Sequence, residues 1–171
     1  MSNSISDYAE VTAKVRRLGD RMHTSPLAGT AVEELTDGIN SLIFEKGYGG
    51  ELAASWHDLR GAHDVSKRLV ELTRGGQNTL LAIMSNYNFA GERLRAHMVT
   101  IAGVRGLSTG SATVTFNDPD DNDNLLTQSA RNPHTHQLGS DDGNGVELIG
   151  FGAVAGADRL ESVVVVGPTA H

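Results

Sequence analysis

The repeat of apolar residues changes at Gly103, and this change is the strongest constraint on the fold. Before it, apolar residues recur every three or four positions, which is the period of an amphipathic α-helix. After it, they alternate with threonine or form unbroken valine runs, which is typical of β-strands. The pattern predicts an α+β chain, with a four-helix bundle in residues 1–106 and a small antiparallel β region or extended arm in residues 107–171.

Four amphipathic helices are expected in the first part of the chain. Ser25 is a candidate N-cap with Pro26 at the first helical position, and glycines at 47, 75, 76 and 103 are candidate ends. The fourth helix has the most regular repeat, because a spacing of four and three runs from Leu80 to Ile101. The expected ranges are about 6–22, 25–47, 52–74 and 80–101.

The second part of the chain is expected to form short strands joined by polar loops. Strands are predicted around residues 112–116, 146–154 and 163–166, and loops at 117–124 and 132–144. A sheet of about three short strands is barely stable alone. We therefore expect this acidic, glycine-rich arm to pack on neighbouring subunits.

The net negative charge of the chain lies wholly in this arm. The chain has 14 basic and 21 acidic residues, a net charge of −7, and residues 107–171 hold 2 of the basic and 9 of the acidic ones. An acidic balance gives no long-range attraction to nucleic acid or anionic lipid, so neither partner is expected. A partner surface that meets the 118–123 loop is expected to be basic or neutral. The absence of cysteine excludes disulfides and thiol chemistry, and no apolar run is long enough to span a bilayer.

One serine lies in a pattern used by hydrolases. Gly106 to Gly110 reads G-x-S-x-G around Ser108, and Asp118 and His134 follow in the order of a catalytic triad. That mechanism needs a strand before the serine and a helix after it, whereas we predict a helix before it and a strand after it. A helix-to-strand connection is the preferred interpretation, and a small serine hydrolase using Ser108 is the third functional alternative.

Two further patterns have a ligand-binding interpretation. Residues 150–156 resemble a dinucleotide loop, but the chain that follows has no room for a crossover helix, so glycines in a hairpin are preferred. Residues 118–124 place oxygen ligands at the spacing of a calcium loop, yet Asp123 stands where glycine is needed and Ser129 where glutamate is needed.

His134 and His136 form the remaining candidate site. Two histidines separated by one residue lie on one face of an extended chain, and two ligands alone make a weak metal site. We predict exposed loop histidines here. No catalytic, cofactor-binding or metal residue is assigned, and it stays open whether His134, His136 or the 118–124 loop binds a metal.

The N-terminal residues resemble phage head–tail adaptor (connector) proteins. The resemblance lies in Tyr8 to Val11, in Arg17-Leu18-Gly19, and in the stretch from Glu34 to Ile43. It covers about the first 45 residues and implies a helical subunit whose C-terminal arm contacts its neighbours in the neck of the virion.

Residues 52–101 more loosely resemble WXG-type substrates of type VII secretion, which are helical hairpins. Trp56 is followed by His57-Asp58, so the W-x-G signature itself is missing. This resemblance implies a secreted helical interaction protein.

The sequence thus predicts a non-enzymatic structural subunit of a large assembly. Its expected setting is a phage virion, at the head–tail junction or in the capsid, assembled in the host cytoplasm. Its expected partners are copies of itself and other structural proteins of the assembly. A secreted interaction protein is the alternative.

Overall fold

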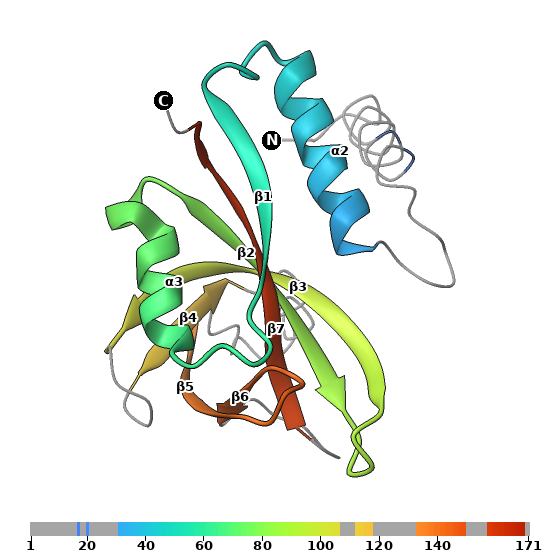
Figure 1. The fold of residues 1–171 in the computed structure, drawn as a ribbon, viewed down its shortest axis with the longest axis vertical. Coiled ribbons are helices and arrows are strands. Elements are labelled where there is room, and N and C mark those ends of the chain that lie inside the picture. Colours follow the sequence, from blue (N-terminus) through green and yellow to red (C-terminus); the bar gives the residue numbers. More distant parts are fainter. Residues whose placement is uncertain are drawn as a thin grey trace, which may run out of the picture. The chain divides into compact units, whose positions relative to one another are not determined.

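The computed structural model describes residues 17, 20, 31–106, 112–117, 133–149 and 157–169 (Figure 1). The chain divides into two compact units. Unit 1 comprises residues 1–56 and 168–171, and unit 2 comprises residues 57–167. Each unit therefore contains residues from both sides of the boundary expected after residue 106.

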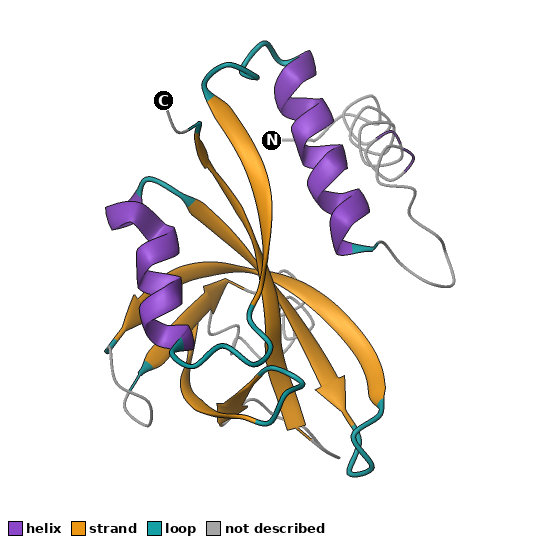
Figure 2. Cartoon of the chain, viewed as in Figure 1, coloured by secondary structure: helices purple, strands orange, loops and turns teal. Residues whose placement is uncertain are grey.

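Strands predominate over helices in the described residues (Figure 2). Unit 1 holds α2 and most of β1, and unit 2 holds nearly all of the rest. In chain order the elements are α2 (Val32–Glu45), β1 (Leu52–Asp58), α3 (Val65–Thr73), the 3-10 turn η1 (Arg74–Gly76), β2 (Thr79–Tyr87), β3 (Arg93–Arg105), β4 (Thr113–Asn117), β5 (His134–Asp141), β6 (Val146–Ile149) and β7 (Ala157–Pro168).

Unit 2 is a closed antiparallel barrel of six strands. Its strands follow the order β7-β2-β3-β4-β5-β6, and β6 pairs again with β7, which closes the ring. The closing pair is short, with Val146 opposite Leu160 and Glu147 opposite Arg159. Closure leaves no free edge in these six strands, because every strand has a partner on both sides.

Apolar side chains at alternate positions of the strands fill the interior of the barrel. On β2, Leu80, Ala82 and Met84 are buried in the core, and their partners on β7 include Val165 and Val163. Successive side chains of a strand point to opposite faces, so every second residue enters the interior. The core continues around the ring through Val99, Ala112, Val114, Phe116, Leu138, Val146, Leu148 and Leu160.

Helix α3 adds apolar side chains to this core. It begins at the cap residue Asp64, whose carboxylate accepts a hydrogen bond from Lys67 N, and it ends at Arg74 in a left-handed conformation. Leu69 and Leu72 point into the barrel core, and the helix contacts β2 and β3. Packing of its apolar stripe on the sheet therefore stabilises this short helix.

In unit 1, helix α2 is tied to the start of β1 by one amide side chain. Asn40 Oδ1 accepts a hydrogen bond from Ala54 N at 2.7 Å, and Asn40 Nδ2 donates to Ala54 O at 3.0 Å. Thr169 N donates to Glu51 O at 2.9 Å, which holds residue 169 to the turn before β1. Asn40 thus satisfies both backbone groups of a strand residue.

The predicted four-helix bundle is wrong. Residues expected in the fourth helix form the hairpin β2–β3, and the start of the expected third helix is β1. A spacing of four residues, such as that between Leu80 and Met84, is also a multiple of the two-residue strand period, so it did not discriminate helix from strand. The second expected helix does contain α2, and Arg17 and Asp20 are helical within the first.

The prediction of an extended arm is also wrong, because the strands of residues 107–171 complete the barrel. The predicted strands contain β4, β6 and part of β7, but the expected loop at 132–144 contains β5. That segment has one large apolar residue, Leu138, and it becomes a strand because its backbone pairs with β4 and β6.

A mostly β protein with two short described helices matches neither the helical adaptor nor the WXG-type hairpin, so both resemblances are wrong, as is the description of a helical bundle.

Candidate functional site

One polar cluster among the described residues of unit 2 is centred on Glu161. This residue is inserted in β7 where the register with β2 shifts, between the pairs Ile83 with Ser162 and Met84 with Leu160. Such a β-bulge turns one side chain away from the regular ladder. The Glu161 side chain is only 9% exposed, and its backbone oxygen accepts a hydrogen bond from Leu59 N at 2.8 Å.

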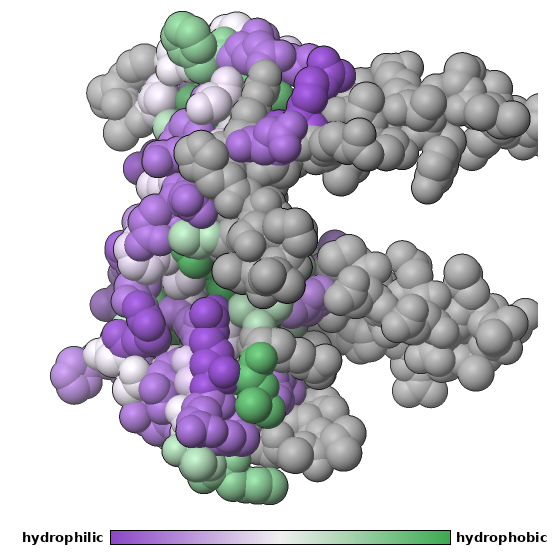
Figure 3. All heavy atoms as spheres, turned by 90° about the vertical axis from the view of Figure 1, so that its right-hand side faces the viewer, coloured by the Kyte–Doolittle hydropathy of each residue, from purple (hydrophilic) through white to green (hydrophobic). Residues whose placement is uncertain are grey.

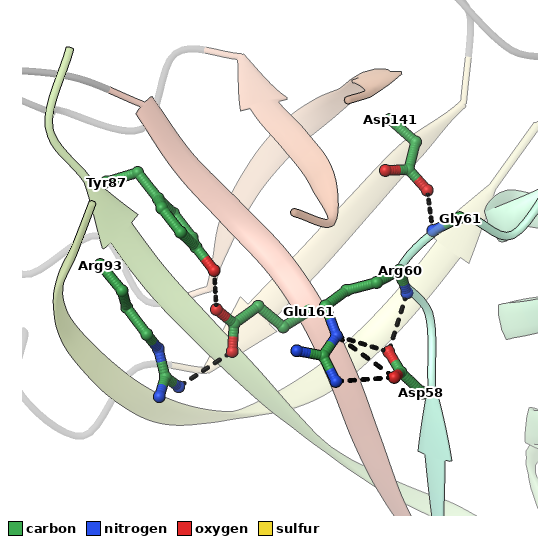
Figure 4. Close-up of polar contacts among 7 residues, drawn as sticks. All are labelled: Asp58, Arg60, Gly61, Tyr87, Arg93, Asp141 and Glu161. Carbon is green, nitrogen blue, oxygen red and sulfur yellow. Dashed lines mark hydrogen bonds and ion pairs between the residues drawn. The ribbon is translucent and has the colours of Figure 1, made fainter. Parts of the chain in front are cut away.

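Two neighbouring strands supply the partners of the Glu161 carboxylate (Figure 4). Tyr87, at the end of β2, donates its hydroxyl to Oε1, and Arg93, at the start of β3, donates Nη2 to Oε2 at 2.9 Å. Tyr87 and Arg93 are themselves paired across the β2–β3 ladder. Arg93 also donates Nε to Ser85 Oγ at 2.9 Å. The carboxylate therefore connects β7, β2 and β3.

The cluster keeps Tyr87 in its neutral form. Burial, together with the hydrogen bond and the negative charge of Glu161, raises the pKa of Tyr87 to about 12. A phenol with this pKa donates a proton in a hydrogen bond at neutral pH and does not act as a base. Ser85 is 1% exposed and its oxygen accepts from Arg93, so its hydroxyl is out of reach of a substrate. The geometry favours a role in joining strands over a role in catalysis.

A second ion pair lies beside this cluster, between the last residue of β1 and the segment that follows it. Arg60 Nη2 contacts Asp58 Oδ2 at 2.7 Å, and Nε donates to the same carboxylate. The Arg60 guanidinium, which donates to the carboxylate, lowers the pKa of Asp58. Nearby, Gly61 N donates to Asp141 Oδ2 at 2.6 Å, so the same short segment is also fixed to the end of β5.

A small pocket of about 50 Å³ is lined by residues from the start of α3 and from β5 and β6. Its polar lining consists of His63, Ser66 and Asp141. Ser66 Oγ donates to Asp64 Oδ1 at 3.0 Å, and Asp141 accepts from Gly61 N and Gly143 N. These groups hold the surrounding loops, and the volume suits an occupant about the size of water.

Several candidates from the sequence lie outside the described residues. These are Ser108, the 118–124 loop with Asp118, and the glycines of residues 150–156. The element before residue 106 is the strand β3 and the next described one is β4, so the helix expected before Ser108 is wrong.

The two histidines lie on β5 and not in a loop. His136 is buried at 8% exposure, and its ring stacks on Phe116 with the centroids 6.1 Å apart. The backbone of His134 pairs with that of Phe116. Within the described part of the chain, no group of three or more His, Asp or Glu side chains is arranged to hold a metal.

The sequence interpretation missed the Glu161 cluster. Tyr87 and Arg93 both lie in the range 80–101, which was expected to form the fourth helix. The sequence contained one signal of this cluster. Glu161 is separated from the unbroken apolar run Val163–Val166 by a single serine. A charged residue beside a buried strand needs a partner.

Large apolar side chains are exposed at two turns, one in each unit. In unit 2, Phe89 is 89% exposed at the tip of the β2–β3 hairpin, and Leu94 is 57% exposed just after it. Figure 3 shows hydrophobic residues in green at this end of the molecule. In unit 1, Phe44 in the last turn of α2 is 79% exposed, and Tyr48 in the turn between α2 and β1 is 52% exposed. Exposed aromatic residues of this kind are enriched at protein interfaces.

No described helix is long and apolar enough to cross a membrane. No family model matches the chain, and no curated protein matches it significantly.

Proposed function

We propose that this protein is a non-enzymatic structural subunit that assembles with other copies of itself. The observation that carries the proposal is the exposure of large aromatic side chains at two separate turns. A subunit that uses two different surfaces can bind two neighbours, which is the requirement for a ring or a longer array.

The energy available from these side chains supports the proposal. Burying one Phe or Leu side chain contributes roughly 1.5–3 kcal/mol. Phe89 and Leu94 on one turn, and Phe44 and Tyr48 on the other, together provide an apolar centre for each of two contacts. Aromatic residues at the centre of an interface often carry most of its binding energy.

A phage virion is one setting for such a subunit, as the sequence predicts. The helical resemblance that pointed there is contradicted by the fold, so the proposal rests on the exposed surface alone. The described polar cluster supports no enzymatic alternative, because its serine is buried and its carboxylate is held by two donors.

The mass of the full-length protein in solution tests the proposal. Light scattering and native mass spectrometry at micromolar concentration are expected to show a species larger than a dimer. The double variant Phe44→Ser with Phe89→Ser is expected to be monomeric and folded. A wild-type protein that stays monomeric contradicts the proposal, and so does hydrolase activity that Ser108→Ala abolishes.

A further inference from the structure

We infer that Asn40 blocks a site for strand addition on the free edge of β1, and so keeps a second copy of this chain from pairing with β1. The edge site is defined as the backbone N–H and C=O groups of β1 that point towards α2. This surface is separate from the exposed turns, and the inference does not rest on the proposed function.

The strand β1 has one free edge. Among the described strands it has a strand neighbour on one side only. Glu51 O accepts a hydrogen bond from Thr169 N, and Leu59 N donates to the backbone of β7, so odd-numbered positions face the occupied side. Backbone groups alternate in direction along a strand. The N–H and C=O groups of Ala54 and Trp56 therefore point to the free edge.

The side chain of Asn40 occupies this edge at Ala54. It extends from α2, which runs alongside β1 (Figure 1). Ala54 N donates to Asn40 Oδ1 at 2.7 Å, and Ala54 O accepts from Asn40 Nδ2 at 3.0 Å. In an antiparallel sheet, two directly opposite residues exchange the same two bonds. The Asn40 carboxamide thus takes the place of a residue of an added strand, and the two exclude each other.

The residues of β1 provide little other protection against pairing. None of the seven is proline or lysine, which natural edge strands use to oppose strand addition. A covering helix is another such device. The buried residues of α2 are Leu35, Thr36 and Gly38, so this helix has little buried apolar surface to hold it in place. Loss of the two Asn40 bonds is therefore expected to release the edge of β1.

A second copy of β1 fits the released edge, because the strand is complementary to itself about Ala54. In an antiparallel pair centred on the two Ala54 residues, Leu52 of one copy stands opposite Trp56 of the other. Pairs of aromatic and aliphatic side chains across two strands stabilise a sheet. Ala53 stands opposite Ser55 in the same register, and both of these small residues are exposed.

Disulfide trapping in the full-length protein tests the edge site, because the chain has no cysteine of its own. A protein with Ala53→Cys is mixed with one that carries Ser55→Cys, and oxidised glutathione serves as the oxidant. Opposite residues of this kind lie about 4.5 Å apart at Cα, within the range of a disulfide. With Asn40→Leu in both proteins, the linked heterodimer is expected to form about tenfold or more faster than with Asn40.

Two further variants control for a loosened helix. Ser41→Leu introduces the same side chain at the next, exposed position of α2 and is expected to leave trapping at the wild-type rate. Asn40→Asp keeps the acceptor for Ala54 N and loses the donor to Ala54 O, so its rate is expected to lie between those of wild type and Asn40→Leu. Circular dichroism establishes that each variant is folded, and Asn40→Asp provides the comparison if Asn40→Leu is not.

Equal trapping rates in the wild type and in the folded Asn40 variants overturn the inference. Acceleration by Ser41→Leu to the same extent overturns it as well, because the effect then belongs to the helix and not to the carboxamide. Assembly through the exposed turns acts alike on all of these proteins. A failure of the proposed function therefore leaves the comparison unchanged.

Discussion

At the scale of single residues, Glu161 shows how a charge is accommodated next to a valine-rich strand. Its two carboxylate oxygens accept hydrogen bonds from Tyr87 and Arg93, so the cost of burying the charge is offset by two donors from neighbouring strands. Removing one donor leaves a nearly buried carboxylate oxygen without its partner, and the fold then loses the free energy needed to desolvate that oxygen.

Tyr87→Phe is therefore expected to lower the free energy of unfolding by about 1–3 kcal/mol. Denaturant unfolding measures the difference. Tyr48→Phe is the matched control, because Tyr48 is 52% exposed and its change is expected to leave stability nearly unaltered. Equal effects of the two substitutions would show that the hydroxyl of Tyr87 does not stabilise the fold.

Alkaline pH provides a second measurement on the same residue. The pKa of Tyr87 is raised from 10.0 to about 12, so the folded state holds this proton more tightly than the unfolded state. The resulting stability is fully present below pH 10 and is lost as the pH rises towards 12. Ultraviolet titration of the phenolates is expected to show one of the three tyrosines ionising late, and Tyr87→Phe should remove that component. Ionisation of all of them together contradicts the prediction.

His57 makes stability depend on pH in the opposite sense to Tyr87, because its contribution is lost as the pH falls. Burial and the nearby Arg68 guanidinium lower the pKa of His57 below 6.5, and Arg68 Nη2 lies 3.2 Å from His57 Nδ1. The unfolded state then binds the proton more readily, so this contribution to stability is present above pH 6.5 and is lost as the pH falls through the folded pKa. In NMR titrations Arg68→Gln should raise the pKa of His57, and an unchanged pKa would exclude Arg68 as a cause.

At the scale of elements, the turn between β5 and β6 is a closely packed part of the barrel. A Cβ on Gly145 would lie 2.6 Å from Leu160 O, and the φ of Gly145 is +114°. Gly143 in the same turn has a φ of +92° and nothing within 4 Å of such an atom. The glycine at 145 therefore permits the close approach of β6 to β7, where the barrel closes.

Gly145→Ala is expected to destabilise unit 2 by about 1–3 kcal/mol more than Gly143→Ala. Both substitutions introduce a side chain at positive φ, so their difference isolates the clash with Leu160 O. Thermal unfolding of the two variants provides the comparison, and equal losses would show that β6 and β7 can move apart without cost.

The strands were predictable where the sequence has one-sided alternation or β-branched runs. Threonine alternating with Val114 and Phe116 marked β4, and Val163–Val166 marked part of β7. β5 carries a single large apolar residue, so its strand state comes from pairing with its neighbours and left no local pattern to read. The β2–β3 hairpin was misread because its apolar spacing fits both periods, although Asn88 and Gly91 stand at its turn.

At the scale of the whole molecule, the barrel joins residues that the sequence pattern assigned to separate parts. Strands β2 and β3 come from before residue 106, and β4 to β7 come from after it. The Glu161 cluster was not predictable for the same reason, because Tyr87 and Glu161 are 74 residues apart and meet only through the β2–β7 pairing.

Removal of residues 107–171 is consequently expected to abolish the cooperative unfolding of unit 2. The truncated chain lacks four of the six barrel strands and would expose the apolar face of β2. Circular dichroism and calorimetry of the truncated protein measure this effect. A truncated protein that still unfolds in one sharp transition would show that β2 and β3 have a core independent of β4 to β7.

The position of β7 in the ring has a consequence for synthesis on the ribosome. β7 pairs with β2 on one side and with β6 on the other, so the ring cannot close until residues 157–168 have left the exit tunnel. Until then the nascent chain exposes the unpaired edge of β2 and the apolar residues of β2 to solvent. Chaperones that bind extended apolar segments are expected to meet this chain between the emergence of β2 and that of β7.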